Sequence, residues 1–336
     1  MSRPRVAVLI PSFNHARFLP ATLASVLAQT LRPAEVLVLD DGSGDGSAAV
    51  AERILGGTAG ITWSVVSRPN RGISATRNEL FARSRAEFVA FLDSDDLYAP
   101  DRLARMLEGA PAGRPWLAFS GVKLRHEGPG AAAEECAAWR EMYRLRLGQA
   151  AVLPTVGFAL LRSNLALSAS NLVLNRELFE RVGGFDETIR ICQDWDFLVQ
   201  ALPHAEPCFV PLPLLEYRVH GENTSRDAAL TAAHELNTVW RKAAIWLGQT
   251  TPSRSAPGPA NWPRYYRWFA RLHAPRGQTI LPIEPPATRP DHPGRARLEE
   301  SALQALVQEA SIDHDHAGDD EQELMLRCAR RWEAAR

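Results

Sequence analysis

The stretch Phe88-Val89-Ala90-Phe91-Leu92-Asp93-Ser94-Asp95-Asp96 indicates both the fold and the place of a ligand site. Its first five residues form an apolar run that is typical of a strand buried on both faces. Carboxylates follow where this strand ends, and open α/β sheets bind ligands at that edge. Asp93 and Asp95 point the same way in extended backbone, because side chains alternate with period two. The stretch therefore predicts a ligand site at the carboxyl end of a central strand.

These neighbouring carboxylates repel one another unless a cation or protons lie between them. Oxygen ligands suit Mg²⁺ or Mn²⁺, which proteins hold with one or two carboxylates and substrate phosphates. The alternative is an acidic loop that begins the next helix, with Asp96 or Asp101 as its cap. A bare D-x-D favours that alternative, so the metal hypothesis depends on the rest of the chain.

Strands and helices alternate around this stretch. Apolar runs predict strands over 5–10, 35–39, 61–66 and 88–92, and helical spacing predicts helices over 16–29, 48–55 and 74–84. This order is typical of an α/β fold with a doubly wound, mostly parallel sheet flanked by helices. The second strand ends in Asp40 and Asp41, which we expect at the same sheet edge as Asp93 and Asp95. No G-x-G-x-x-G follows the first strand and no G-K-[ST] is present, so metal and side chains would have to meet any phosphate charge.

Composition bounds the class of protein. The chain has 336 residues, of which 46% are hydrophobic and 23% charged, and its formal net charge is −1. A soluble globular protein without general attraction to nucleic acid fits these values. The four cysteines form no C-x-x-C pair, which predicts reduced thiols in a cytoplasmic protein. The N-terminus lacks a signal-peptide core, and the longest apolar region, 150–174, is broken by Arg162, Asn164 and Asn171.

Seven short motifs follow one another along the first two thirds of the chain. They are Val8-Leu9-Ile10-Pro11-Ser12-Phe13-Asn14, Leu39-Asp40-Asp41-Gly42-Ser43, Asn70-Arg71-Gly72-Ile73-Ser74-Ala75-Thr76-Arg77-Asn78, Phe91-Leu92-Asp93-Ser94-Asp95-Asp96, Val182-Gly183-Gly184-Phe185-Asp186-Glu187, Gln193-Asp194-Trp195-Asp196 and Tyr217-Arg218-Val219-His220-Gly221-Glu222-Asn223-Thr224-Ser225. In this order they resemble the family-2 glycosyltransferases, which have the nucleotide-sugar-binding GT-A fold. Each motif alone is weak, but seven in order are specific for the family and not for one substrate.

The resemblance implies a donor site for a nucleotide-sugar. Its matching residues are Pro11, Ser12, Phe13, Asn14, Asp41, Arg71, Arg77, Asp93 and Ser94. The turn that begins at Pro11 matches the floor beneath the nucleotide base, and Asp41 matches the carboxylate that accepts a base N–H. Arg77 matches a cation near the diphosphate, and Asp93 matches the residue near the ribose. Arg77 as a solvated helix residue is the alternative.

The resemblance also implies the metal ligands and the general base. Asp95 matches the metal ligand, and His220 matches a late histidine near the metal or the diphosphate. A histidine in a turn is the alternative for His220. Asp194 matches the general base, although a helix start is the alternative, and Asp196 suits that alternative better. The family usually has Glu where this chain has Gln193, which removes one negative charge near Asp194.

The chemistry agrees with these roles. A sugar leaves a nucleotide diphosphate when cations stabilise the leaving charge, and a carboxylate can take the proton of the acceptor hydroxyl. One base opposite the leaving group inverts the anomeric centre. We expect a metal-dependent inverting glycosyltransferase that uses Mn²⁺ or Mg²⁺. UDP-sugars are the favoured donors, with dTDP- or GDP-sugars as alternatives.

The acceptor would be a saccharide or a lipid-linked molecule, in the assembly of a polysaccharide, glycolipid or other glycoconjugate.

Two other functions fit the sequence less well. A nucleotidyltransferase would need a Gly-rich loop with Arg and Lys after the first strand, and Pro11 to His15 supplies neither glycine nor lysine. A non-catalytic nucleotide-sugar-binding or scaffold protein is supported only by Gln193. Trp195 lies on the acceptor side or in the core. No partner nucleic acid is expected, and a homodimer is compatible with the sequence.

The predicted catalytic domain spans 1–225, with a nucleotide-sugar-binding half at 1–110 and an acceptor half at 111–225. A helical extension follows at 226–336, with helices expected over 228–247, 298–310 and 321–335 and a Pro-rich stretch at 251–293. Aromatics and arginines at 262–272 suggest either packing on the catalytic domain, which we favour, or contact with the inner face of the membrane. The D-H-D-H run at 313–316 has no apolar flank and is read as a solvated loop.

Overall fold

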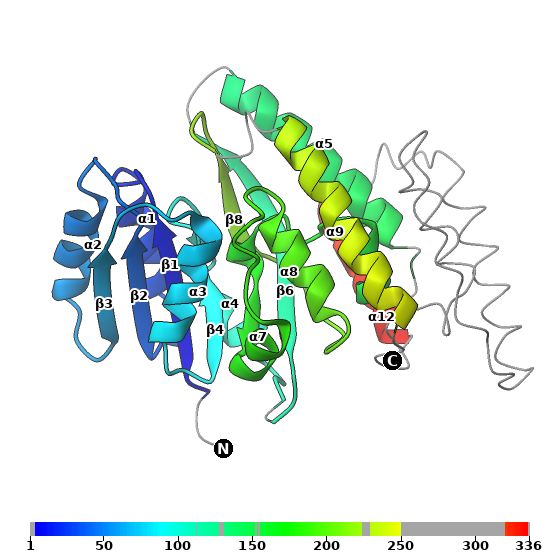
Figure 1. Ribbon diagram of the computed structural model, residues 1–336, viewed down its shortest axis with the longest axis horizontal. Coiled ribbons are helices and arrows are strands. Elements are labelled where there is room, and N and C mark those ends of the chain that lie inside the picture. The colour runs from blue at the N-terminus through cyan, green and yellow to red at the C-terminus, as the bar shows by residue number, and fades with distance from the viewer. Residues whose placement is uncertain are drawn as a thin grey trace, which may run out of the picture.

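The computed structural model describes residues 4–111, 113–127, 131–151, 153, 155–223, 229–249 and 320–334. Within these ranges the core is one eight-stranded sheet in the order β3-β2-β1-β4-β7-β6-β8-β5, flanked by helices (Figure 1). This arrangement confirms the predicted α/β fold. The sheet is mixed, and the strands from the N-terminal part of the chain pair in parallel. None of the helices in the described ranges has both the length and the apolar character that a membrane crossing requires.

The N-terminal part of the sheet is parallel. It consists of β1 (Val6–Ser12), β2 (Glu35–Asp40), β3 (Thr62–Ser67) and β4 (Phe88–Phe91). Every residue of β1, β2 and β4 is buried, as continuous apolar runs in a doubly wound sheet predict. Because the strands are parallel, their carboxyl ends bring the loops after β1, β2 and β4 together at one edge.

Three helices connect these strands: α1 (Leu19–Leu27), α2 (Ser47–Gly56) and α3 (Ile73–Arg83). Helix α3 packs on β1 and β2, and α2 packs on β2 and β3. The sequence predicted that the first helix begins at Ala16, but α1 begins at Leu19. Residues before it form a loop in which Asn14 has φ of +54°, a left-handed conformation that ends regular structure. That loop lines the site described below.

The other part of the sheet is mixed. It holds β7 (Val173–Asn175), β6 (Leu117–His126), β8 (Cys208–Val219) and the short β5 (Leu97–Tyr98). β7 runs antiparallel to β4 and β6, β6 runs parallel to β8, and β5 runs antiparallel to β8. Its helical elements are α4 (Arg102–Met106), α5 (Ala131–Ala150), α6 (Val156–Arg162), the 3-10 turn η1 (Ala169–Asn171), α7 (Arg176–Val182) and α8 (Gln193–Ala201). Helix α7 ends at the left-handed Gly183, and Phe185, which follows closely, is buried.

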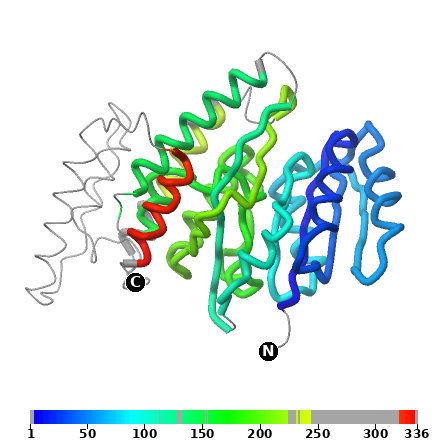
Figure 2. The backbone as a smooth tube through the Cα atoms, turned by 180° about the vertical axis from the view of Figure 1, so that it is seen from behind, coloured from blue at the N-terminus to red at the C-terminus, as the bar shows by residue number. Residues whose placement is uncertain are grey.

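Within the described residues, two helices follow the last motif. Helix α9 (Ala229–Gln249) packs against α8, and α12 (Glu321–Ala334) packs against α5 and β8 (Figure 2). Leu324, Met325, Cys328 and Trp332 of α12 are buried in the core. Both helices agree with the sequence prediction to within two residues at each end. The predicted elements at 251–293, 262–272, 298–310 and 313–316 lie outside the described residues.

Candidate functional site

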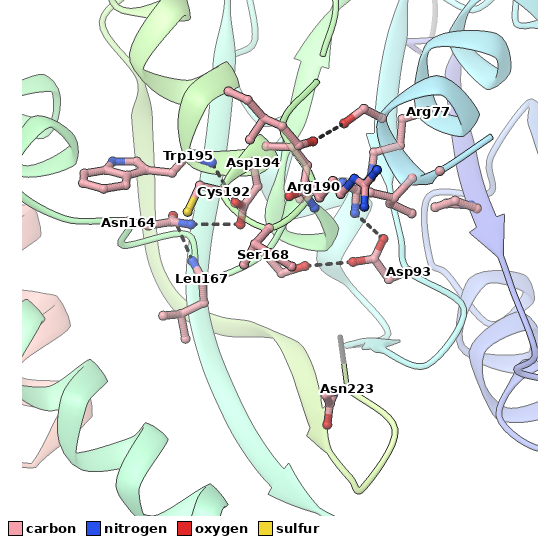
Figure 3. Close-up of a pocket in the computed structure, with 18 of the residues that line it drawn as sticks. Arg77, Asp93, Asn164, Leu167, Ser168, Arg190, Cys192, Asp194, Trp195 and Asn223 are labelled. Atoms are coloured by element: carbon pink, nitrogen blue, oxygen red, sulfur yellow. Dashed lines mark hydrogen bonds and ion pairs between the residues drawn. The ribbon is translucent and has the colours of Figure 1, made fainter. Parts of the chain in front are cut away.

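A pocket of about 1360 Å³ lies at the carboxyl edge of the parallel strands and extends toward α8 and α9. Its wall includes every predicted site residue except Asn14 and His220: Pro11, Ser12, Phe13, Asp41, Arg71, Arg77, Asp93, Ser94, Asp95 and Asp194. Figure 3 shows Arg77 and Asp93 on one side, with Asp194 and Asn164 on the other. The motifs, which are far apart in sequence, therefore meet around one cavity.

The loops after β1 and β2 hold each other in place. The Asn14 N–H donates to Ser43 Oγ (2.8 Å), the Asn14 side-chain oxygen accepts from Gly44 N–H (2.9 Å), and His15 N–H donates to Ser47 Oγ (3.0 Å). Asn14 therefore shapes the loop, while the Phe13 ring is 46% exposed at the pocket. Gly42 has φ of +86°, and a Cβ there would meet the Asn70 nitrogen at 3.0 Å. This position needs glycine because the β2 and β3 loops touch there.

Asp41 is buried and holds the third loop. Its Oδ1 accepts from the Arg71 N–H (2.9 Å) and from the Arg68 guanidinium, and its Oδ2 accepts from the Gly72 N–H (2.9 Å). A carboxylate offers about four acceptor positions, so one position on Oδ2 is left for a ligand. Arg71 contributes its backbone, since its side chain is 60% exposed at the rim. The sequence did not predict Arg68.

Arg77 is a buried guanidinium, 2% exposed, in the wall of the pocket. Its Nη2 donates to Asp93 Oδ1 (2.6 Å), while its Nε and Nη1 have no hydrogen-bond partner among the described residues. Ser168 Oγ donates to the other Asp93 oxygen (3.1 Å). The alternative of a solvated Arg77 is therefore wrong. Two unused donors on a buried cation suit an anionic or oxygen-rich ligand.

Asp95 lies between two histidines. His220 Nε2 is 3.0 Å and His15 Nε2 is 3.8 Å from Asp95 Oδ2. One ligand atom from each residue lies within 4.8 Å of the others. Burial raises the pKa of Asp95, but the His220 hydrogen bond and the charges of both histidines outweigh burial and lower it. A carboxylate with two imidazoles is a donor set that fits a divalent cation such as Mn²⁺.

His15 was not among the predicted ligands. Its Nδ1 shares a hydrogen bond with Ser94 Oγ (2.8 Å), which aims its Nε2 at Asp95. Ser94 is buried, so it acts through His15 in this arrangement. The position of His15, just past Asn14 at the same sheet edge as Asp95, is the sequence signal that could have found it.

The last carboxylate of the D-x-D run plays a different part. Asp96 is buried, and its Oδ1 accepts from the Arg218 N–H (3.1 Å). Burial, together with the negative charges of Asp95 and Asp93, raises the pKa of Asp96 well above its usual range. Asp101 stands at the start of α4 without a side-chain cap. The acidic-loop alternative is therefore wrong for Asp96, while Asp101 does occupy the N-cap position of α4 but makes no capping hydrogen bond with its side chain.

Asp194 lies in the first turn of α8, across the pocket from Asp93 (Figure 3). Its Oδ2 accepts from Asn164 Nδ2 (2.9 Å) and its Oδ1 from the Trp195 N–H (2.7 Å). Burial raises the pKa of Asp194 to about 6, although the Arg77 charge and these two hydrogen bonds oppose the rise. A carboxyl group that titrates there is ionised at neutral pH and still basic enough to accept a proton. Asn164 is a second contact that the sequence did not predict.

Asp196 does not cap α8. The N-cap residue is Cys192, which makes no side-chain cap, and Asp196 pairs with Lys242 of α9 at 2.8 Å. Trp195 is buried, donates from Nε1 to the Leu160 carbonyl (2.7 Å) and meets Trp240 edge to face at the pocket wall. Trp195 thus belongs to both the core and the wall, while Asp196 serves to join two helices.

Known proteins resemble this chain in sequence. The family model "Glycosyl transferase family 2" matches residues 7–163. The succinoglycan biosynthesis protein ExoO of Rhizobium meliloti is 29% identical over 240 residues, which are 69% of this chain and 65% of ExoO. Matches to two curated glycosyltransferases of Bacillus subtilis and Nostoc cover about a third of those proteins' length, 31% and 32%.

Solved structures share the fold. The TarS fragment 1–349 of S. aureus, solved with UDP-GlcNAc, aligns with a TM-score of 0.56 at 15% identity, over 98% of this chain and 90% of the fragment. A mannosyltransferase of Pyrobaculum calidifontis, solved with GDP-Man and Mn²⁺, aligns with a TM-score of 0.55 at 20% identity, over 99% of this chain and 88% of the other. With the seven motifs gathered around one pocket, these matches lead to one conclusion: residues 7–163 match the family-2 glycosyltransferases, and the chain has the GT-A fold.

Proposed function

We propose that this chain transfers a sugar from a nucleotide-diphosphate sugar to an acceptor hydroxyl, with inversion at the anomeric carbon. The observation that carries the proposal is Asp194, a buried carboxylate with a pKa raised to about 6. It lines the same pocket as Asp95, which lies beside His15 and His220. A base near neutral pH can take the acceptor proton as the new bond forms. Because one base faces the leaving group across the sugar, attack comes from the far face.

The donor would lie along the Asp95 side of the pocket. The free acceptor position on Asp41 suits one N–H of the nucleotide base, and the exposed Phe13 ring offers a face on which the base can stack. The unpartnered Nε and Nη1 of Arg77 are placed to donate to the diphosphate or to the transferred sugar. A uracil ring, with its single N–H at that edge, fits the one free acceptor position, so UDP-sugars remain the favoured donors, and thymine offers the same N–H, so dTDP-sugars are an alternative. GDP-Man in the mannosyltransferase neighbour keeps GDP-sugars as a further alternative.

His15, Asp95 and His220 would hold a divalent cation. Imidazole nitrogens suit Mn²⁺ better than Mg²⁺, which prefers oxygen ligands, so Mn²⁺ is the favoured ion of the two. When bound, such an ion offsets the charge that develops on the leaving diphosphate. The neighbour solved with GDP-Man and Mn²⁺ supports this assignment.

The acceptor would enter on the Asp194 side. Trp139, Trp195, Tyr217 and Trp240 contribute aromatic surface to this part of the pocket. Aromatic faces with scattered polar groups suit a saccharide, and the likeness to ExoO supports a role in polysaccharide assembly.

The first experiment identifies the donor. Thermal shifts with UDP-, dTDP- and GDP-sugars in the presence of Mn²⁺ find the nucleotide, since a tight ligand raises Tm by mass action. Transfer is then measured for the wild type, Asp194→Asn and Asp196→Asn. We expect Asp194→Asn to bind donor normally and to lose kcat by about 10²–10⁴-fold. Asp196→Asn should lose stability and little rate, and full transfer by both variants would refute the single-base mechanism.

A further inference from the structure

We infer that Glu235 of α9 is a positioning residue for Asp194, through the turn that starts α8. This inference rests on the proposed role of Asp194 as the base. Glu235 lies beyond residues 7–163, which match the family model, and beyond the last motif. Its carboxylate is 7% exposed and faces the segment that leads into α8.

Three consecutive backbone N–H groups converge on this one side chain. Arg190 N–H donates to Oε1 (2.8 Å), while Ile191 and Cys192 N–H donate to Oε2 (2.7 and 2.9 Å). Hydrogen bonds from backbone N–H groups to a buried carboxylate are charge-assisted and about twice as strong as neutral ones. The carboxylate therefore fixes the backbone of the turn, since all three donors must point at it together.

The helix start needs this outside support. Cys192 is the N-cap residue of α8, and its side chain makes no capping hydrogen bond to the first turn. Asp194 follows Cys192 by two residues, and the direction of its side chain depends on the phase of this first turn. Asn164 then holds the Asp194 carboxylate from the opposite side (2.9 Å). A turn released from Glu235 would change the aim of the base, whereas the hydrogen bonds that hold Asp41 and Asp95 come from other residues.

A second link between α8 and α9 provides a matched control. Lys242 lies two turns further along α9 and pairs with Asp196 (2.8 Å) and Asp186 (2.7 Å). It joins the same two helices but makes no contact with residues 190–192 among the hydrogen bonds of the described chain. Lys242→Gln therefore weakens the docking of α9 without releasing the turn. Arg241→Gln, at an exposed position beside it, controls for loss of one positive charge on α9.

The test compares Glu235→Gln with Lys242→Gln in the full chain. Glu235→Gln keeps the size of the side chain but places an NH₂ group against backbone N–H donors. We expect kcat to fall about 10- to 100-fold, as small misplacements of reacting groups do, with the donor KM within about twofold of wild type. Lys242→Gln should lower Tm and keep kcat. Equal kcat losses in both variants, or a donor KM that rises in step with the kcat loss, would overturn the inference.

Amide hydrogen exchange separates this inference from the proposed function. In Glu235→Gln the amides of residues 190–192 should exchange faster, while those of β1 and β4 keep the wild-type rate. Unchanged exchange at 190–192 refutes the inference whatever the chain catalyses. Faster exchange with wild-type kcat also refutes it, whereas full transfer by Asp194→Asn refutes the base and not the Glu235 contact. If Glu235→Gln does not fold, Glu235→Asp takes its place, because it keeps the charge on a shorter side chain. Its kcat should then fall less than the loss expected for Glu235→Gln, again with the donor KM nearly unchanged, and an unchanged kcat would overturn the inference.

Discussion

The Asp95 side and the Asp194 side of the pocket are held by different means. On the Asp95 side, loops at the ends of adjacent parallel strands hold one another through Asn14, Ser43 and Asp41. On the Asp194 side, Asn164 precedes the base by 30 residues and Glu235 follows it by about 40 along the chain. The comparison teaches that the loops after β1, β2 and β3 largely hold one another, whereas the base depends on contacts with Asn164 and, through its turn, with Glu235 of α9.

Removing the charge of Asp95 should lower the rate of transfer more than any other change on this side of the pocket. Asp95→Asn keeps an acceptor for His220 but removes the charge between the two histidines. Metal-dependent turnover should fall by at least about 10²-fold, because charge stabilisation at the leaving group is lost. Steady-state transfer with titrated Mn²⁺ measures this, and Asp101→Asn, at a side chain that is 43% exposed at the start of α4, is the control. Full activity of Asp95→Asn, or of the wild type in excess EDTA, would contradict the metal site.

Breaking the fold behind the pocket should cost stability and leave the chemistry intact. Trp332 of α12 is 4% exposed and donates to the Leu153 carbonyl (3.1 Å). Trp332→Ala should lower the free energy of unfolding by about 3–5 kcal/mol, through lost burial and a cavity. Leu326→Ala, at an exposed position of the same helix, is the control. Urea unfolding measures the change, and a kcat loss in the folded Trp332→Ala protein would show that α12 reaches the site.

The pH dependence of the free energy of unfolding tests whether Asp194 is held in a buried site that raises its pKa. Its pKa is raised from 3.8 to about 6 in the folded protein, so the folded state holds this proton more tightly than the unfolded chain does. Stability from this group is therefore present at low pH and is lost as the pH rises between about 4 and 6. Two units correspond to about 3 kcal/mol at most. Denaturant unfolding of the wild type, relative to Asp194→Asn, should show this loss, and parallel pH curves would contradict the raised pKa.

The nucleotide itself can test Asp41 without changing the protein. If the free acceptor position on Asp41 takes the N–H of uracil, UDP methylated at N3 should bind more weakly than UDP. The expected loss is about 1.5–3 kcal/mol, typical of a hydrogen bond to a charged group. Calorimetry measures both affinities, and CDP, which lacks this N–H, serves as a second comparison. Equal affinity for UDP and its N3-methyl form would place the base elsewhere.

The sequence predicted the Asp95 side better than the Asp194 side for a physical reason. Strand ends show in the sequence as apolar runs followed by Asp or Gly, so Asp41, Asp93 and Asp95 could be located before their contacts were known. Asp194 was identified by its motif. Its partners Asn164 and Glu235 could not be, because they depend on how α6 and α9 pack, which periodicity does not indicate. Asp196 was expected at a helix start and lies in the first turn of α8, but its pairing with Lys242 could not be predicted, because an acidic residue in a first turn looks the same with or without such a partner.

The pH dependence of transfer by Asp194→Asn tests the central claim most directly. With the donor found by thermal shift and saturating Mn²⁺, wild-type kcat should rise with pH through an apparent pKa near 6, as the raised pKa of Asp194 requires. Asp194→Asn should keep donor affinity, lose about 10²–10⁴-fold in kcat and lose this rise with pH. An unchanged acidic limb in Asp194→Asn, or a kcat close to that of the wild type, would contradict Asp194 as the base.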